Sequence, residues 1–263
     1  MTGELLAVQA VSRSFGGLRA LQDVSFSVTP GQVAAIIGPN GAGKSTLFNI
    51  IAGSLRPDRG RVELRGRLIT GASPHEIAGL GVARTFQTTR LFTRMTVVEN
   101  VMVGAHVRMR AGFLSALLGL PWTRREEAVA LGKARGILSE LGLAAHQDRT
   151  ASTLSFGQRR VLELARALAA EPEVLLLDEP AAGLTIAETE RLGELIGGFK
   201  QRGITVLLVE HDMSLVMGIS ERVVVLAAGR KIAEGAPREI QADRSVVEVY
   251  LGSPEPGEAH AQG

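Results

Sequence analysis

Short apolar runs recur along the chain and indicate buried strands. They are "VAAIIG" (33–38), "EVLLLDE" (173–179) and "ITVLLVE" (204–210), and the last two end in acidic residues. A helical pattern over residues 186–202 separates these two runs. Strands that are apolar on both faces and alternate with helices predict a parallel sheet that is covered on both sides.

The pattern elsewhere predicts strands and turns first and then helices. Residues 92–150 are rich in arginine and helical, without a clear strand, so we expect an α/β sheet that a mainly helical insertion interrupts near 88–165. The other predicted elements are strands in "LLAVQAVSRSF" (5–15), "LQDVSFSVTPGQ" (21–32) and "RPDRGRVELRGR" (56–67), helices in "TLFNIIAGSL" (46–55) and over 158–170, and a hairpin over 222–235.

The composition of the chain excludes several kinds of chemistry and of partner. The chain has 263 residues, of which 45% are hydrophobic, so it suits one large domain or two modest ones. It contains no cysteine, which excludes disulfides, thiolate catalysis and Cys-ligated zinc. The 29 basic and 27 acidic side chains nearly balance, so we expect no nucleic-acid partner. "MTGELLAVQA" does not resemble a signal peptide and no apolar run reaches about 18 residues, so we expect another chain to cross any membrane involved.

A glycine-rich loop, "GPNGAGKST" (38–46), lies between an apolar strand and a helix. This G-x-x-x-x-G-K-[ST] pattern in that context predicts a phosphate-binding loop, whereas a glycine turn with a chance lysine is the alternative. Lys44 is expected to reach the β- and γ-phosphates of a nucleotide, Ser45 to bind Mg²⁺ and Thr46 to contact the α-phosphate. The backbone of the loop is supplied by Gly38, Pro39, Asn40, Gly41, Ala42 and Gly43.

Two acidic residues end the strand in "VLLLDEP". We expect Asp178 to belong to the Mg²⁺ site and Glu179 to activate the attacking water as general base, a role that contributes about 10²–10⁴-fold in rate. A solvated turn would also place two acids here. Their combination with the glycine loop favours the catalytic interpretation.

The stretch "LSFGQ" directly precedes the helix predicted after it. Ser155 and Gln158 fit a capping box, in which each side chain accepts from the other residue's backbone N–H. Taken alone, this pattern indicates a helix start and nothing more. Its position between the glycine loop and "LLLDEP" gives it a second interpretation.

The three motifs in this order resemble the ATP-binding subunits of ABC transporters, over residues 5 to about 252. The resemblance implies a P-loop NTPase (RecA-like) fold, with a mainly parallel sheet, N-terminal antiparallel strands and an inserted helical subdomain. It also implies that the signature loop (residues 154–158) contacts the γ-phosphate of ATP held by another subunit. That loop consists of Leu154, Ser155, Phe156, Gly157 and Gln158, with Ser155 and Gly157 as the ligands in trans.

Further site residues are implied by the same resemblance. Phe15 occupies the position of an adenine-stacking aromatic residue, although a single Phe is often a core residue; stacking of this kind contributes about 1–3 kcal/mol. Gln87, in "RTFQ", matches the glutamine that contacts Mg²⁺ and water, and His211, after "VLLVE", matches the histidine that contacts the γ-phosphate. Two positions depart from the usual pattern, since Phe156 replaces Gly and Thr185 replaces Asp.

These departures, together with several other segments, narrow the resemblance to one branch of the family. With "DEPAAGL", "RTFQTTRLFTRMTVVEN", "GFLSALLGLPWTRREE", "VEHDM" and "VVEVYLG", the chain looks like the ATPase of branched-chain amino acid importers. Urea importers and lipopolysaccharide exporters have similar ATPases and remain alternatives. A non-transport ABC ATPase would usually carry coiled-coil or zinc insertions or two cassettes, and a P-loop kinase or GTPase would not explain "LSFGQ" with His211.

The resemblance also implies an assembly at the cytoplasmic face of the plasma membrane. It comprises two membrane-spanning permease subunits, a second and non-identical ATPase and, indirectly, an extracytoplasmic solute-binding protein, with ATP and Mg²⁺ as cofactors. Leu91 and Phe92 are expected to face a cytoplasmic helix of the permease. The implied ABC ATPase domain (5–252) divides into a nucleotide-binding core (5–87 and 166–235), the helical insertion (88–165) and a C-terminal extension (236–252), before a disordered tail (253–263).

Overall fold

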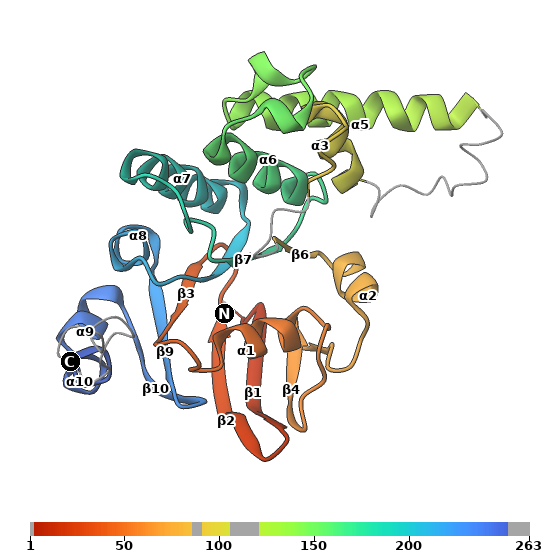
Figure 1. The fold of residues 1–263 in the computed structure, drawn as a ribbon. Coiled ribbons are helices and arrows are strands. Elements are labelled where there is room, and N and C mark those ends of the chain that lie inside the picture. Colours follow the sequence, from red (N-terminus) through yellow and green to blue (C-terminus); the bar gives the residue numbers. More distant parts are fainter. Residues whose placement is uncertain (1–2, 86–90, 106–120, 252–263) are drawn as a thin grey trace.

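Two sheets organise the chain in the computed structural model, which describes residues 3–85, 91–105 and 121–251 (Figure 1). The larger sheet has the order β10-β9-β3-β8-β7-β6 and is parallel except for β10, which pairs antiparallel with β9. Its strands are β3 (Val33–Ile37), β6 (Val82–Arg84), β7 (Val174–Asp178), β8 (Thr205–Val209), β9 (Arg222–Ala227) and β10 (Arg230–Gly235).

The smaller sheet is antiparallel and has the order β2-β1-β4-β5. Its strands are β1 (Leu6–Phe15), β2 (Leu18–Val28), β4 (Arg59–Leu64) and β5 (Arg67–Leu68). The helices of the fold are α1 (Lys44–Ile51), α2 (Pro74–Gly79), α3 (Val97–Ala105), α5 (Pro121–Glu140), α6 (Phe156–Leu168), α7 (Ile186–Phe199), α8 (Met213–Ile219), α9 (Pro237–Ala242) and α10 (Arg244–Leu251).

The parallel sheet separates two hydrophobic cores, because successive side chains of a strand point to opposite faces. In β3, Ala34 and Ile36 pack with α1 and the antiparallel sheet. Val33, Ala35 and Ile37 pack on the other face, where residues of α3 and α5 to α10 complete the core. All five β3 side chains are buried, as they are in β7 and β8, which confirms the prediction of a sheet covered on both sides.

The predicted strands and long helices are present, with small shifts at their ends. The helix expected from residue 158 begins at Phe156, since Ser155 has an extended backbone and caps it. Helix α7 ends at Phe199 and a 3₁₀ turn continues to Arg202. The sequence did not predict α2, β6 and α8, which are three to seven residues long and too short to show a hydrophobic period.

The region around α3, α5 and α6 lies beside the sheet (Figure 1). In the described parts of residues 92–150 there is an isolated bridge between Thr96 and Thr150 but no strand. The expectation that Leu91 faces a partner is wrong, because its side chain is only 9% exposed and packs in the helical core. The neighbouring Phe92 is 46% exposed. None of the helices that the structure describes is long and apolar enough to cross a membrane.

Replacing Phe199 with alanine is expected to lower the free energy of unfolding by about 3–5 kcal/mol. Its ring is 1% exposed at the end of α7, so truncation leaves a cavity in the core on the helical face of the sheet. Urea titration followed by circular dichroism measures the loss. Val129→Ala, at a side chain 59% exposed on α5, is the control, with an expected change within about 0.5 kcal/mol. If the urea midpoints and slopes of the two variants are equal, Phe199 does not contribute to the core as its burial indicates.

Candidate nucleotide-binding and hydrolysis site

The glycine loop (residues 38–46) turns from the end of β3 into the start of α1 and requires glycine at specific points. Gly38 and Gly43 have φ of 148° and 100°, a region that residues with a side chain rarely adopt. A Cβ at Gly38 would lie 2.0 Å from the carbonyl oxygen of Leu226, and one at Gly43 would lie 2.5 Å from that of Ala20. The loop is therefore packed against β9 and β2 through its own backbone.

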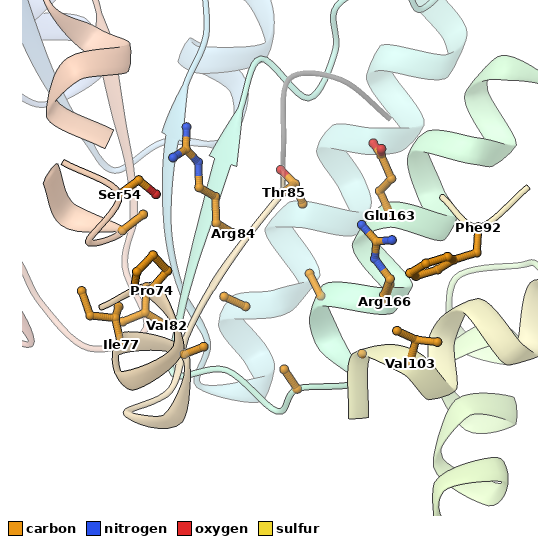
Figure 2. A pocket seen from close by; sticks show the side chains of 16 residues that line it. Ser54, Pro74, Ile77, Val82, Arg84, Thr85, Phe92, Val103, Glu163 and Arg166 are labelled. Atoms are coloured by element: carbon orange, nitrogen blue, oxygen red, sulfur yellow. The ribbon is translucent and has the colours of Figure 1, made fainter. Parts of the chain in front are cut away.

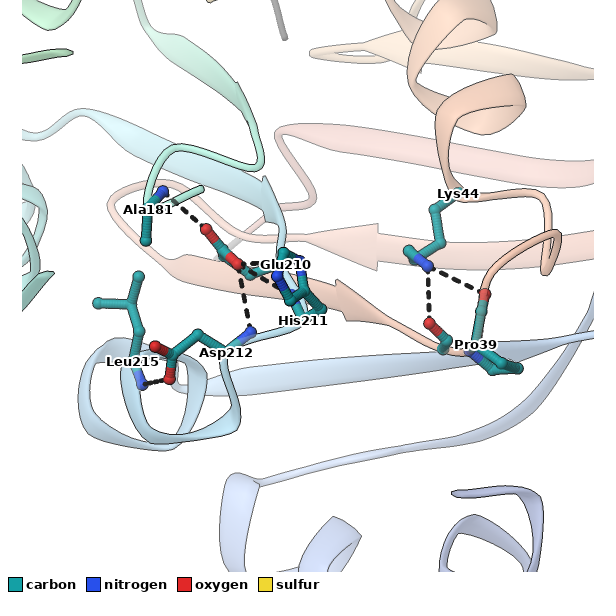
Figure 3. Close-up of polar contacts among 8 residues, drawn as sticks. Pro39, Lys44, Ala181, Glu210, His211, Asp212 and Leu215 are labelled. Atoms are coloured by element: carbon teal, nitrogen blue, oxygen red, sulfur yellow. Dashed lines mark hydrogen bonds and ion pairs between the residues drawn. The ribbon is translucent and has the colours of Figure 1, made fainter. Parts of the chain in front are cut away.

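Lys44 is folded back into this loop, where its side chain is buried (Figure 3). Its Nζ donates to the carbonyl oxygens of Gly38 at 2.6 Å and Pro39 at 3.0 Å. Burial lowers the pKa of the Lys44 ammonium, while the negative charges of Glu179 and then Asp178 raise it. The charged oxygens of a nucleotide phosphate are stronger acceptors than these carbonyl groups, so a bound phosphate can replace them as partners of the ammonium.

A cavity of about 610 Å³ brings most of the predicted nucleotide-binding residues together. Phe15 lies at its wall with a side chain 44% exposed, so it is not a core residue. The guanidinium carbon of Arg13 lies 4.9 Å from the centre of the Phe15 ring, and Arg13 is itself paired with Asp58 at 2.6 Å. The predicted residues that line the cavity are Phe15, Asn40, Gly41, Ala42, Gly43, Lys44, Ser45, Thr46 and Glu179.

Asp178 ends β7 and is only 1% exposed. Its Oδ2 accepts from Nη2 of Arg84 at 2.9 Å, whereas its buried Oδ1 has no hydrogen-bond partner among the described residues. An unsatisfied carboxylate oxygen at the end of β7 and the exposed Ser45 hydroxyl at the start of α1 are oxygen ligands of the kind that Mg²⁺ or its bound water prefers. The sequence did not single out Arg84, which also donates to Asn49 Oδ1 at 2.7 Å.

Glu179 has an unusual backbone conformation. Its φ is 47°, in the left-handed region that a glutamate seldom adopts without support from its surroundings. Its N–H donates to the carbonyl oxygen of Val209 at 2.9 Å, and its own carbonyl accepts from Ala182 at 3.2 Å. The turn thus begins at the end of β7 and presents Glu179 to the nucleotide cavity.

His211 follows β8, the strand that lies between β3 and β7 in the sheet. The carboxyl ends of these parallel strands share one edge, so His211 emerges at the same edge as the glycine loop and Glu179. Its side chain is 65% exposed and its Nδ1 lies 3.7 Å from Oε2 of Glu210. Unlike Glu179, it does not line the 610 Å³ cavity. Gln87 lies outside the described residues.

The signature loop forms the predicted capping box at the start of α6. Ser155 Oγ accepts from the Gln158 N–H at 3.2 Å, and the Gln158 side chain accepts from the Ser155 N–H at 3.0 Å. Leu154 is buried in the helical core, whereas Phe156 is 41% exposed, with the guanidinium groups of Arg159 and Arg160 near its ring.

The signature loop lines a different cavity from the one that the glycine loop lines. Ser155, Gly157 and Gln158 line a hollow of about 210 Å³ together with Glu188 of α7, and none of them lines the 610 Å³ cavity. Thr185, which departs from the usual pattern, caps α7 in a second box with Glu188. Within one chain, therefore, the glycine loop and the signature loop do not face a common ligand.

Comparison with known proteins agrees with this arrangement. Residues 21–182 match the ABC transporter family, and residues 230–256 match the family described as branched-chain amino acid ATP-binding cassette transporter. The relative named high-affinity branched-chain amino acid transport ATP-binding protein LivG, of Escherichia coli strain K12, is 44% identical over 253 residues, which cover 96% of this chain and 99% of LivG. The protein of the same description named BraF, of Pseudomonas aeruginosa, is 44% identical with the same coverage.

Solved structures give the same result for the fold. An ATP-binding cassette of an ABC transporter in its ADP conformation is 38% identical, with a TM-score of 0.84, over 96% of this chain and 100% of that one. A nucleotide-free cassette is 37% identical, with a TM-score of 0.83, over 95% and 100% of the two chains. The P-loop NTPase fold predicted from the sequence is thus confirmed. The chain belongs to the family of ABC transporter ATP-binding proteins, which bind and hydrolyse ATP.

Proposed function

We propose that the chain is the ATP-hydrolysing motor subunit of an importer for branched-chain or related amino acids. The observation that carries this proposal is the separation of the two halves of the site: the glycine loop with Glu179 faces one cavity and the signature loop faces another. Such halves combine when two subunits meet, so that each nucleotide lies between chains. The matches to LivG and BraF over nearly the whole chain support the substrate class.

Each residue of the site has a role in this proposal. The adenine stacks on Phe15, and the backbone of the glycine loop with Lys44 binds the phosphates. Ser45, Asp178 and Gln87 would hold Mg²⁺, which would supply positive charge to neutralise the phosphates. Glu179 accepts a proton from the attacking water, and His211 orients the γ-phosphate.

The assembly is the second part of the proposal. Two permease subunits cross the plasma membrane, and this chain works at their cytoplasmic face with a second, non-identical ATPase, while a solute-binding protein acts on the outer side. ATP drives transport only if it binds the closed dimer better than the open one. We propose that residues 5–252 are one ABC ATPase domain, with a core (5–87, 166–235), a helical insertion (88–165) and an extension (236–252); the tail expected to be disordered lies outside the described residues.

A groove beside β6 fits the proposed contact with the permease (Figure 2). It has a volume of about 430 Å³ and is bordered by α2, β6, α3 and α6. Phe92 lies in its wall, with its ring 46% exposed. The buried side chain of Asn100 holds the Phe92 backbone, accepting from its N–H at 2.9 Å and donating to its carbonyl at 3.0 Å. An aromatic ring on a fixed backbone, with Arg166 near it and Arg84 on the far side of the same groove, is typical of an interface anchor.

Glu179→Gln is expected to bind ATP normally and to lose nearly all hydrolysis, about 10²–10⁴-fold, because the amide cannot accept the proton of the attacking water. Equilibrium ATP binding and single-turnover hydrolysis measure the two effects. Glu173→Gln, directly before the start of β7 and away from the cavity, is the control. Hydrolysis within a few-fold of the unmodified chain would show that Glu179 is not the base.

Ser155→Arg is expected to leave ATP affinity of the isolated chain intact and to abolish ATP-dependent association, since a charged side chain would occupy the place of the partner's γ-phosphate. It also removes a helix cap, which costs about 1 kcal/mol. Ser73→Arg removes the same kind of cap from α2 and is the control. Association is measured by sedimentation with and without ATP. The Glu179→Gln background is used so that ATP is not hydrolysed during the measurement. If both arginine variants lose stability and both still associate, Ser155 is only a cap.

Phe92→Ala is expected to leave the basal ATPase of the isolated chain unchanged and to uncouple it from transport in the assembled complex. Met95→Ala is a matched control, because Met95 is 38% exposed three residues away and does not line the groove. Solute uptake and ATP hydrolysis are measured on the same reconstituted complex. If uptake and hydrolysis fall together, in proportion to the loss of folded protein, the groove assignment is wrong.

A further inference from the structure

Glu210, directly after β8, has a completely buried carboxylate that joins two loops (Figure 3). Its Oε1 accepts from the backbone N–H of Ala181 at 2.8 Å. Its Oε2 accepts from the backbone N–H groups of His211 at 2.9 Å and Asp212 at 3.2 Å. Each oxygen therefore serves a different loop, one after β7 and one after β8.

These bonds explain how a charge can be buried at this position. A buried carboxylate is strongly unfavourable unless hydrogen-bond donors surround it. Three backbone N–H groups supply them here, and hydrogen bonds to an ionised acceptor are about twice as strong as neutral ones. The carboxylate thus fixes backbone positions in both loops, which no apolar side chain of similar size would do.

The loop after β7 needs such a constraint. Glu179 has a φ of 47°, a conformation that costs about 1–3 kcal/mol and persists only where the surrounding structure enforces it. Ala181, two residues later, is held by Glu210, and the Glu179 N–H is held by the last residue of β8. The strained turn is consequently tied twice to the segment that carries His211.

We propose that Glu210 is a positioning residue, which holds the general base Glu179 and the γ-phosphate contact His211 in a fixed relation to each other. The inference rests on the roles given to those two residues under the proposed function. Glu210 itself does not touch the nucleotide cavity and takes no proton in the reaction. Its effect is on the geometry of hydrolysis and not on the affinity for ATP.

Glu210→Gln is the informative substitution, because it keeps the size of the side chain and leaves a single acceptor oxygen for two loops. Its NH₂ group must face either the Ala181 N–H or those of His211 and Asp212. We expect kcat to fall about 10–100-fold, since displacement of a catalytic group by 1 Å has that effect. We expect the KM and the dissociation constant for ATP to stay within threefold, because the glycine loop keeps its own contacts.

Thr205→Val is the matched control for stability. Thr205 is buried at the opposite end of β8, and its Oγ1 accepts from the Gly31 N–H at 2.8 Å. The valine removes one buried hydrogen bond from the same strand, far from the site. Its kcat per folded molecule is expected to equal that of the unmodified chain, while both variants lower the melting temperature.

Glu210→Asp tests the link to Ala181 alone and serves if the glutamine variant does not fold. The shorter side chain keeps its charge and its adjacent N–H groups but withdraws by about 1.5 Å from Ala181. A kcat loss in both Glu210 variants, with ATP binding retained, supports the inference. Values within threefold of the unmodified chain, or an equal kcat loss in Thr205→Val, overturn it. Activity in Glu179→Gln would instead refute the proposed function, so the two failures are distinguishable.

Discussion

Parallel pairing of β3, β7 and β8 is the constraint on which the site depends. Each strand of a parallel sheet delivers its following loop to the same edge, so the glycine loop, the acidic turn and the histidine loop converge there although they are far apart in the sequence. The register places Asp178 opposite Val209 and Ile36 opposite the same residue. The three strands are buried throughout and are apolar except for Thr205 at the start of β8 and Asp178 at the end of β7, so the edge that they share is firmly packed. The exact position of each loop then depends on contacts near that loop.

Local precision comes from backbone groups that are pinned by buried polar side chains. Asn100 fixes the Phe92 backbone, Thr205 accepts from Gly31, and Glu210 holds the turns on either side of it. In each case an unpaired buried polar group would cost about 1–3 kcal/mol, so the alternative loop positions are disfavoured. Asp178 Oδ1 is different, because this buried oxygen has no hydrogen-bond partner among the described residues.

The parts of the site that the sequence predicts are those whose chemistry is contiguous. The glycine loop, the acidic pair and the capping box each need only neighbouring residues, and the structure forms all three local geometries. The Arg84 contact with Asp178 spans 94 positions and the Glu210 contact with Ala181 spans 29, so no local pattern reveals them. The adjacent Leu91 and Phe92 differ in exposure, and the Asn100 side chain that holds the Phe92 backbone comes eight positions later, so no local pattern separates the two residues.

The signature loop shows how one helix start can serve two purposes. The first turn of a helix leaves four N–H groups without an intrahelical acceptor. The capping box uses the N–H of Gln158, and the side chain of Gln158 in turn satisfies the N–H of Ser155. The N–H groups at the first two helical positions, Phe156 and Gly157, are not used by the box and point along the helix axis, where the dipole favours an anion. A Cβ at Gly157 would lie 2.2 Å from Glu188 Oε1, so a larger residue here would have to displace that carboxylate. Capping orders the end of the helix and leaves its donors free, and for that reason the structural and the phosphate-binding interpretations of "LSFGQ" are compatible.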